Sequence, residues 1–221
     1  LSQTTGAFDR RCNMLPTGRH RYVVGPHRGG TSSRQPGAFR LASSVCVQRS
    51  LYNLGYALGD YWDVSLGNPF DNIHAGVLDT FDHPLDYSSA GCQVLPGSYD
   101  ESRKTPLGAW ATFRSMAGLE PVPVFKTGSI VTTTDDGREF DYLLMTGREA
   151  RLAASPGAVP VRRIRLGSSG AAIPTLRQKL GVPTYHEIDG EAMKALLIWQ
   201  QEFAGFADGI LTPSQQILLE A

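Results

Sequence analysis

Residues 19–24, Arg19-His20-Arg21-Tyr22-Val23-Val24, give the clearest local indication of the fold. Aromatic and β-branched residues are concentrated here and again in Val45-Cys46-Val47, so both segments are predicted to be strands. A hairpin is predicted further along, from 122–133 paired with 140–145 across a turn at Asp135-Asp136-Gly137. These segments indicate a mainly β amino-terminal domain.

One helix is predicted among these strands, from about Pro106 to Ala117. Thr105 suits the N-cap, Pro106 suits the first helical position, and Gly118 suits the end. Four apolar residues follow at helical spacing, and we expect this face to pack against the sheet. They are Leu107, Trp110, Phe113 and Met116.

A change of composition at 153–160 predicts a domain boundary, because this stretch holds two prolines and no charge. Beyond it the apolar residues follow a helical period, which predicts three short helices, the last capped by Thr212-Pro213. Trp199, Phe203 and Phe206 are expected to dominate the small core. The predicted organisation is a domain at 1–152, a linker at 153–164 and a helical domain at 165–221.

Size and charge exclude several classes of protein. The 221 residues suffice for one large domain or a medium domain with a small one. The longest apolar run, Ala195–Trp199, is far shorter than the roughly 20 residues of a membrane span. Because 21 basic residues balance 21 acidic ones, a general nucleic-acid binder is also excluded.

The charge is nevertheless unevenly distributed. Residues 1–50 carry eight arginines, and residues 51–100 carry seven aspartates with no lysine or arginine. Either the two stretches neutralise each other across the fold, or the arginines form a basic wall that faces an anionic substrate.

His74 and Cys92 are the most informative pair for chemistry. A thiolate nucleophile needs an imidazole that takes the thiol proton and later protonates the leaving group. Gly91 allows a tight turn, so that the amides of Gly91 and Cys92 are candidates to stabilise an oxyanion. Two other interpretations remain: Cys92 as a small buried hydrophobe, and a zinc site of His74, His83 and Cys92, whose spacing matches no familiar metal motif.

Other residues are weaker candidates. Three cysteines are too few for a disulfide scaffold, and whether Cys12 and Cys46 pair stays open. His20 and His27 are expected at the surface or on an edge strand, and His83 in a solvated loop. The residues that are candidates to pair with substrate carboxylates or to line a groove are Arg19, Arg21, Arg28, Trp62 and Tyr87.

The segment that contains His74 and the box Ser89-Ala90-Gly91-Cys92 resembles the active-site signature of the L,D-transpeptidase (YkuD-type) family of peptidoglycan enzymes. The resemblance extends over about residues 15–120. It implies a β-sandwich with one or two helices, Cys92 as the acyl-forming nucleophile and His74 as its base. It also implies that the Ala75 carbonyl orients the imidazole, that Gly91 lends an oxyanion amide, that Ser89 belongs to the catalytic box, and that Gln93 contacts substrate.

Two positions depart from that family pattern. Ala90 stands where the box has a histidine, and Val94 stands where a polar residue is usual. Hydrolysis, a narrower exchange reaction and binding without turnover all remain open.

Residues 165–221 resemble the small three-helix peptidoglycan-binding domain of many cell-wall hydrolases. The likeness is carried by Leu176–Gly181, Trp199-Gln200 and the turn at Phe206–Pro213. It implies a domain that anchors the chain to the wall, with a helical appendage that binds nothing as the alternative.

Together the resemblances imply a cysteine-dependent L,D-transpeptidase-like enzyme, L,D-carboxypeptidase or endopeptidase acting on peptidoglycan stem peptides. No cofactor, metal or nucleic acid is expected. The expected location is the cell envelope, the periplasm or the extracellular space, including a virion. The alternative is a non-catalytic wall-binding or structural component, such as part of a phage tail or a secretion apparatus.

Overall fold

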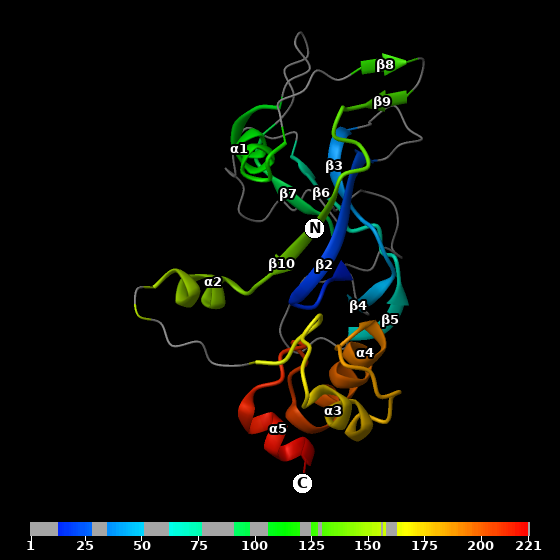
Figure 1. Ribbon diagram of the computed structural model, residues 1–221, viewed down its shortest axis with the longest axis vertical. Coiled ribbons are helices and arrows are strands. Elements are labelled where there is room, and N and C mark those ends of the chain that lie inside the picture. Colours follow the sequence, from blue (N-terminus) through cyan, green and yellow to red (C-terminus); the bar gives the residue numbers. More distant parts are fainter. Residues whose placement is uncertain are drawn as a thin grey trace. The chain divides into compact units, whose positions relative to one another are not determined.

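The computed structural model describes residues 13–27, 35–50, 62–76, 91–97, 106–119, 125–127, 130–155, 157 and 163–220 (Figure 1). Within these ranges the chain combines mixed β-sheets with five α-helices and one π-helical turn. The strands are β1 (Asn13–Met14), β2 (Gly18–His27), β3 (Gln35–Leu41), β4 (Val45–Ser50), β5 (Trp62–Gly67), β6 (Ile73–Ala75), β7 (Gln93–Leu95), β8 (Phe125–Thr127), β9 (Ile130–Thr132) and β10 (Glu139–Leu144). The helices are α1 (Gly108–Met116), α2 (Gly147–Ala154), α3 (Ile173–Lys179), α4 (Gly190–Trp199), the π-helical η1 (Gln200–Ala204) and α5 (Pro213–Glu220). None of the described helices is long and apolar enough to cross a membrane.

The described residues form two compact units. The first takes those within 21–43 and 70–140, and the second takes those within 13–20, 44–69 and 141–220. The second unit therefore joins the carboxy-terminal helices to strands from the amino-terminal half. This division differs from the predicted boundary at 153–164, and the described residues do not show a separate all-α domain.

The first unit is built on a five-stranded mixed sheet of order β10-β2-β3-β6-β7. The pairs β2–β3 and β3–β6 are antiparallel, whereas β6 and β7 run parallel. The strand predicted at 19–24 is confirmed as part of β2. Phe39 on β3 lies at the centre of the core, where its ring meets those of Trp110, Phe113 and Phe140 edge-on.

Helix α1 is confirmed, but it packs differently from the prediction. It begins after Leu107, which makes no side-chain cap, and the predicted cap Thr105 lies outside the described residues. Trp110 is fully buried, whereas Leu107 and Met116 are exposed. Buried Arg114 takes their place, because it pairs with Asp135 and donates to the Gly37 carbonyl. The helix is thus fixed to β3 by its aromatic contacts with Phe39 and by the Arg114 bond to Gly37, and to the turn at 134–137 by the buried ion pair with Asp135.

The predicted hairpin is wrong, although its turn is present at residues 134–137. Strand β9 pairs with β8, and β10 lies beside β2. At the turn itself, the Gly137 amide donates to the Val24 carbonyl, and the Val24 amide donates to the Arg138 carbonyl. Strand β10, which the sequence predicted to pair with β9, therefore pairs with β2 instead.

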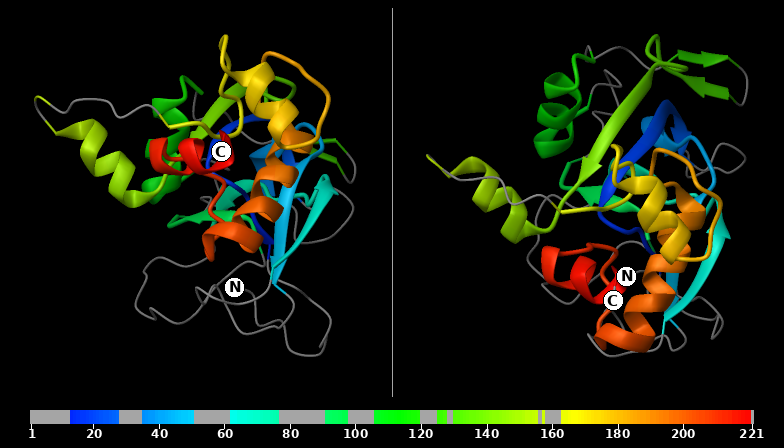
Figure 2. Two further views of the ribbon diagram at one scale, coloured as in Figure 1. Left: turned by 90° about the horizontal axis from the view of Figure 1, so that it is seen from below. Right: turned by 60° about the horizontal axis from the view of Figure 1, so that its bottom comes forward.

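The second unit has one core, shared by helices and strands. The strand predicted at 45–47 is confirmed within β4, and β4 pairs with β1 and β5. Helix α4 buries Met193 and Leu197 in the same cluster as Cys46 on β4, and Figure 2 shows α4 (orange) running beside β5 (cyan). A Cβ at Gly190 would lie 3.2 Å from Leu66 Cδ2 on β5, so glycine avoids a tight contact between the start of α4 and β5.

All three predicted carboxy-terminal helices are present, but the predicted aromatic core is wrong. Phe203 and Phe206 are 64% and 48% exposed, and the core consists of leucine, isoleucine and methionine side chains. The cause is η1, whose longer turn shifts the helical period after Trp199. This turn buries Gln200, which accepts from the Gly209 amide and donates to the Ile210 carbonyl.

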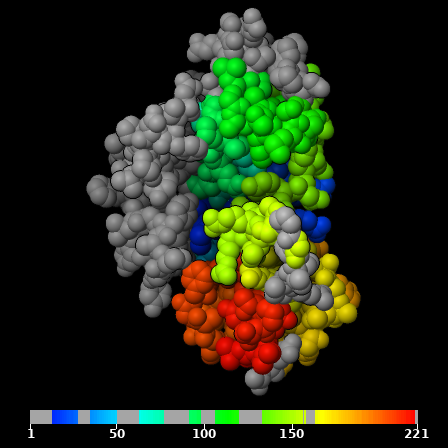
Figure 3. Space-filling model, turned by 90° about the vertical axis from the view of Figure 1, so that its left-hand side faces the viewer, coloured from blue at the N-terminus to red at the C-terminus, as the bar shows by residue number. Residues whose placement is uncertain are grey.

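Two local predictions at the carboxy terminus are confirmed. Asp208 accepts from the Ile210 amide at 2.8 Å, next to Gly209 at φ 71°. Thr212 caps α5 by accepting from the Gln215 amide, while the Gln215 side chain accepts from the Thr212 amide. In Figure 3, α5 (red) lies on the surface of the molecule, next to the orange segment that holds the end of α4 and η1.

Candidate active site

The parallel pair β6–β7 brings His74 and Cys92 together. His74 is the middle residue of β6, and Cys92 directly precedes β7. The Gln93 amide donates to the Asn72 carbonyl at 2.8 Å, which sets Cys92 beside Asn72. The Asn72 amide in turn donates to the Cys92 sulfur at 3.4 Å. All of these residues belong to the first unit.

The His74 ring is held in one orientation. Its Nδ1 lies 2.8 Å from the Ala75 carbonyl oxygen, the contact expected from the resemblance. A carbonyl oxygen only accepts, so Nδ1 carries the proton and Nε2 carries the lone pair. His74 is 7% exposed, so its ring is largely shielded from solvent. A neutral imidazole with its lone pair on Nε2 has the form of a general base.

Cys92 is half-buried, and its thiol has a second partner. The sulfur lies 3.6 Å from the Phe70 carbonyl oxygen, to which the S–H donates. Phe70 itself adopts φ 58°, a left-handed conformation that is unusual for a bulky residue. Strain of this kind is concentrated at functional sites. The sulfur thus lies between an N–H donor and a carbonyl acceptor.

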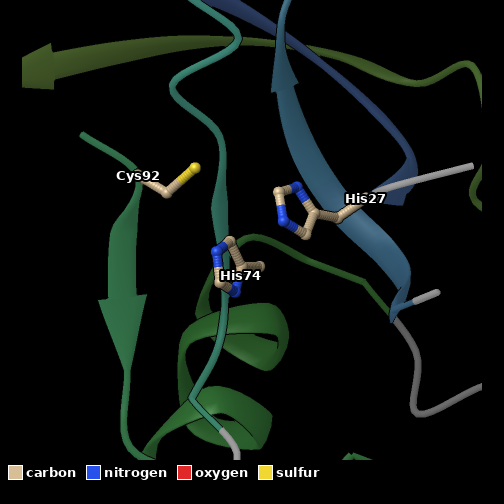
Figure 4. A group of neighbouring side chains, drawn as sticks. All are labelled: His27, His74 and Cys92. Carbon is tan, nitrogen blue, oxygen red and sulfur yellow. The ribbon is translucent and has the colours of Figure 1, made fainter. Parts of the chain in front are cut away.

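His27 is the residue that sequence reasoning missed. The prediction of a surface or edge-strand position is wrong, because His27 is 8% exposed and its ring stacks on His74 at 4.2 Å between centroids. Figure 4 shows His27 and His74 with Cys92 in one cluster, drawn from β2, β6 and the start of β7. The register of β2 shifts between Gly25 and His27. The Gly25-Pro26 pair was the available signal, since such pairs mark bulges and turns.

His20, also expected at the surface, is buried as well. It continues the inward alternation of Tyr22 and Val24 along β2. Its Nε2 donates to the Pro16 carbonyl at 2.8 Å, and burial lowers the pKa of the ring despite that bond. His20 therefore has a structural role in the second unit.

The remaining predicted site residues divide into three groups. Gly91 and Gln93 flank the nucleophile, and Val94 faces His74 in the strand register. Arg19 lies in the second unit, where it pairs with Glu187 at 2.9 Å. Those that lie outside the described residues are Cys12, Arg28, His83, Tyr87, Ser89 and Ala90.

Two of the amino-terminal arginines that the structure describes pair with acids outside 51–100. Arg21 pairs with Glu139, as Arg19 does with Glu187. These two pairs do not follow the first interpretation of the charge pattern, in which the aspartates of 51–100 neutralise the amino-terminal arginines. The aspartate-rich segment from 77 to 90 lies outside the described residues.

Among the described residues, His27, His74 and Cys92 form a group of side chains of the metal-ligating type. One nitrogen of each ring and the sulfur all lie within 4.8 Å of one another. The zinc set considered from the sequence had His83 in place of His27. The hydrogen bonds of His27 decide whether this group suits a metal, as argued below.

The second described cysteine is a useful contrast. Cys46 is fully buried on β4 and is a free thiol, whereas Cys12 lies outside the described residues. Burial raises its pKa to about 12, although Lys194 acts in the opposite direction. Cys46 is therefore a packing residue.

Comparison of the chain with protein-family models, with curated proteins and with solved structures finds no match in any of the three.

Proposed function

We propose that this protein catalyses acyl transfer through Cys92, with His74 as general base. The observation that supports this most strongly is a half-buried thiol beside an imidazole whose Nδ1–H is held by the Ala75 carbonyl. That is the arrangement in which a third group orients the base that activates a nucleophile. The Asn72 amide that donates to the sulfur adds a favourable partner for a thiolate.

The reaction proceeds in two balanced steps. His74 Nε2 takes the Cys92 proton, and the thiolate attacks the acyl carbon to form a tetrahedral adduct. The C–N bond then breaks, the amine leaves with the proton from His74, and a thioester to Cys92 remains. Water, or a second amine, then gives its proton to His74 and attacks the thioester carbon. The C–S bond breaks, the sulfur takes the proton back from His74, and the free acid or the new amide leaves. The backbone amides of Gly91 and Cys92 are the candidates to stabilise the oxyanion.

We place the substrate among peptidoglycan stem peptides, and the protein in the cell envelope or outside the cell. This part rests on the resemblance of the His74 and Ser89-Ala90-Gly91-Cys92 segments to the L,D-transpeptidase signature. On this proposal the first unit is an L,D-transpeptidase-like catalytic domain. Ala90 and Val94 each lack the polar group usual at that position of the family pattern, which leaves hydrolysis, a narrower exchange reaction and binding without turnover to be separated by experiment.

The test is incubation of the full chain with defined muropeptides, followed by mass spectrometry. Loss of a terminal D-residue, cleavage or amine exchange is expected, and Cys92→Ala abolishes it. His74→Gln lowers the rate by about 10²–10⁴-fold, the usual contribution of a general base. Intact muropeptides after incubation with folded protein, over several stem peptides and pH values, would refute the catalytic proposal.

A second candidate function, wall binding without turnover, is favoured by exposed aromatic residues in the second unit. Phe203 and Phe206 expose 64% and 48% of their surface, and Phe203 lies 6.1 Å from the Trp199 ring. Exposed apolar residues that lie next to one another are typical of interaction sites, whereas single ones are common on any protein surface. The test is sedimentation of full-length Cys92→Ala protein with purified sacculi. Phe203→Ser/Phe206→Ser should release it, whereas the matched control Met116→Ser should not.

A further inference from the structure

The Asn72 side chain is fixed at both ends. Its Oδ1 accepts from the Leu41 amide at 3.2 Å, and its Nδ2 lies 2.9 Å from His27 Nδ1. A backbone N–H only donates, so Oδ1 must face Leu41, and Nδ2 must face His27. The amide cannot be reversed without setting two donors against each other. Asn72 therefore donates to His27 Nδ1.

This contact assigns the tautomer of His27. Because Nδ1 accepts, the neutral ring carries its proton on Nε2. His74 has the opposite tautomer, since its Nδ1–H donates to Ala75. The two stacked rings thus carry opposite tautomers, and one nitrogen of each ring lies within 4.8 Å of the Cys92 sulfur (Figure 4).

We infer that His27 is a second functional residue of this site, and that its Nε2–H donates to the thiolate of Cys92. The role rests on the proposed function in that it assigns Cys92 as the nucleophile. Asn72 then acts on the sulfur in two ways. Its backbone N–H donates to the sulfur, and its side chain fixes the tautomer in which His27 Nε2 carries a proton. Donors to an ionised acceptor form the stronger class of hydrogen bond.

The same tautomer disfavours a metal. A ligating imidazole presents a lone pair, usually with its other nitrogen donating to a carboxylate or carbonyl. His74 meets this pattern through Ala75, but His27 does not, because its Nδ1 accepts from an amide. The cluster is therefore built for proton transfer, although its residue types are those of a zinc site.

The first test is the pH dependence of Cys92 alkylation by iodoacetamide, followed on the Cys92 peptide by mass spectrometry. His27→Gln keeps a neutral N–H donor, and His27→Leu removes it at similar size. The glutamine variant should follow the wild-type profile, whereas the leucine variant should reach its half-maximal rate about one pH unit higher. His74 and the buried Asp71 are unchanged in both variants, so the difference reports the donor. Equal profiles for all three proteins, or equal shifts in both variants, would show that His27 only packs.

The second test reverses the tautomer. In Asn72→Asp, one carboxylate oxygen still accepts from Leu41, and the other accepts from His27 Nδ1–H, so Nε2 gains a lone pair. Titration with Co²⁺ should give a thiolate-to-cobalt absorption band in Asn72→Asp, none in Asn72→Asp/Cys92→Ala and none in the wild type. A band in the wild type that Cys92→Ala removes would establish a metal site and overturn the assignment.

Neither test requires turnover. If the glutamine variant follows the wild-type alkylation profile and the leucine variant is shifted as expected, but the protein leaves every muropeptide intact, the proposed reaction is refuted and the role of His27 stands. Turnover that depends on Cys92 but is unaffected by His27→Leu would support the proposed reaction and refute the role of His27.

Discussion

The two described cysteines should differ in reactivity by about three orders of magnitude. Burial raises the pKa of Cys46 to about 12, so at pH 7 about one molecule in 10⁵ carries that thiolate. A cysteine with an ordinary pKa of about 8.5 is about 3% ionised at the same pH. Cys46 is thus about 3,000-fold less ionised than an ordinary cysteine, and its shielding in the core slows its labelling further.

The assay is iodoacetamide labelling of the native chain at pH 7, quenched over time and read on the separate cysteine peptides by mass spectrometry. Cys92 should label at least about 10³-fold faster than Cys46. The same reaction in concentrated urea is the control, because unfolding removes burial and should bring the two rates together. His74→Gln should slow Cys92 and leave Cys46 unchanged.

Two results would refute this reasoning. Labelling of Cys46 within tenfold of Cys92 in the folded chain would mean that β4 is not covered by α4 as described. A Cys92 rate that is the same in wild type and His74→Gln would mean that the imidazole does not act on the thiol.

The second unit supports further predictions, each measurable by urea unfolding of the full chain. Leu197→Ala should cost about 3 kcal/mol, because Leu197 is fully buried, whereas Phe203→Ala should change stability by less than about 0.5 kcal/mol. Asp189→Ala should cost about 3 kcal/mol, since it removes the α4 cap and leaves buried Arg177 without its carboxylate; Asp189→Asn, which keeps a capping oxygen, should cost less. Burial raises the pKa values of Asp189 and Glu149, but hydrogen bonds from arginine and backbone groups, together with the charges of Arg177 and Arg165, outweigh burial and hold both pKa values below their ordinary range. Their contribution to stability is therefore complete above the ordinary carboxyl pKa of about 4 and is lost as pH falls through the lowered values. The unfolding free energy should therefore drop as the pH falls below about 4, and it should drop less in Asp189→Asn.

Short-range signals could be read correctly from the sequence. Gly118 after α1, Asp208-Gly209 in its turn and Thr212 at the start of α5 all depend on groups within a few residues of one another. A cap or a left-handed glycine satisfies its own backbone, so local sequence suffices to predict it. His74 and Cys92 were also candidates from the sequence, because of their residue types and because their segment resembles the L,D-transpeptidase signature.

The tertiary structure decided which strands pair and which surfaces the helices pack against. The pairing of β9 with β8, and the packing of α4 on β4 and β5, depend on which distant apolar faces and strand edges are available. The entry of His27 into the site depends on the register shift between Gly25 and His27, and its tautomer depends on Asn72, 45 residues away along the chain. The sequence alone thus determined that a cysteine and a histidine are candidates for catalysis. Only the fold decided that a second imidazole joins them as a proton donor, because long-range pairing and burial fix where each side chain lies.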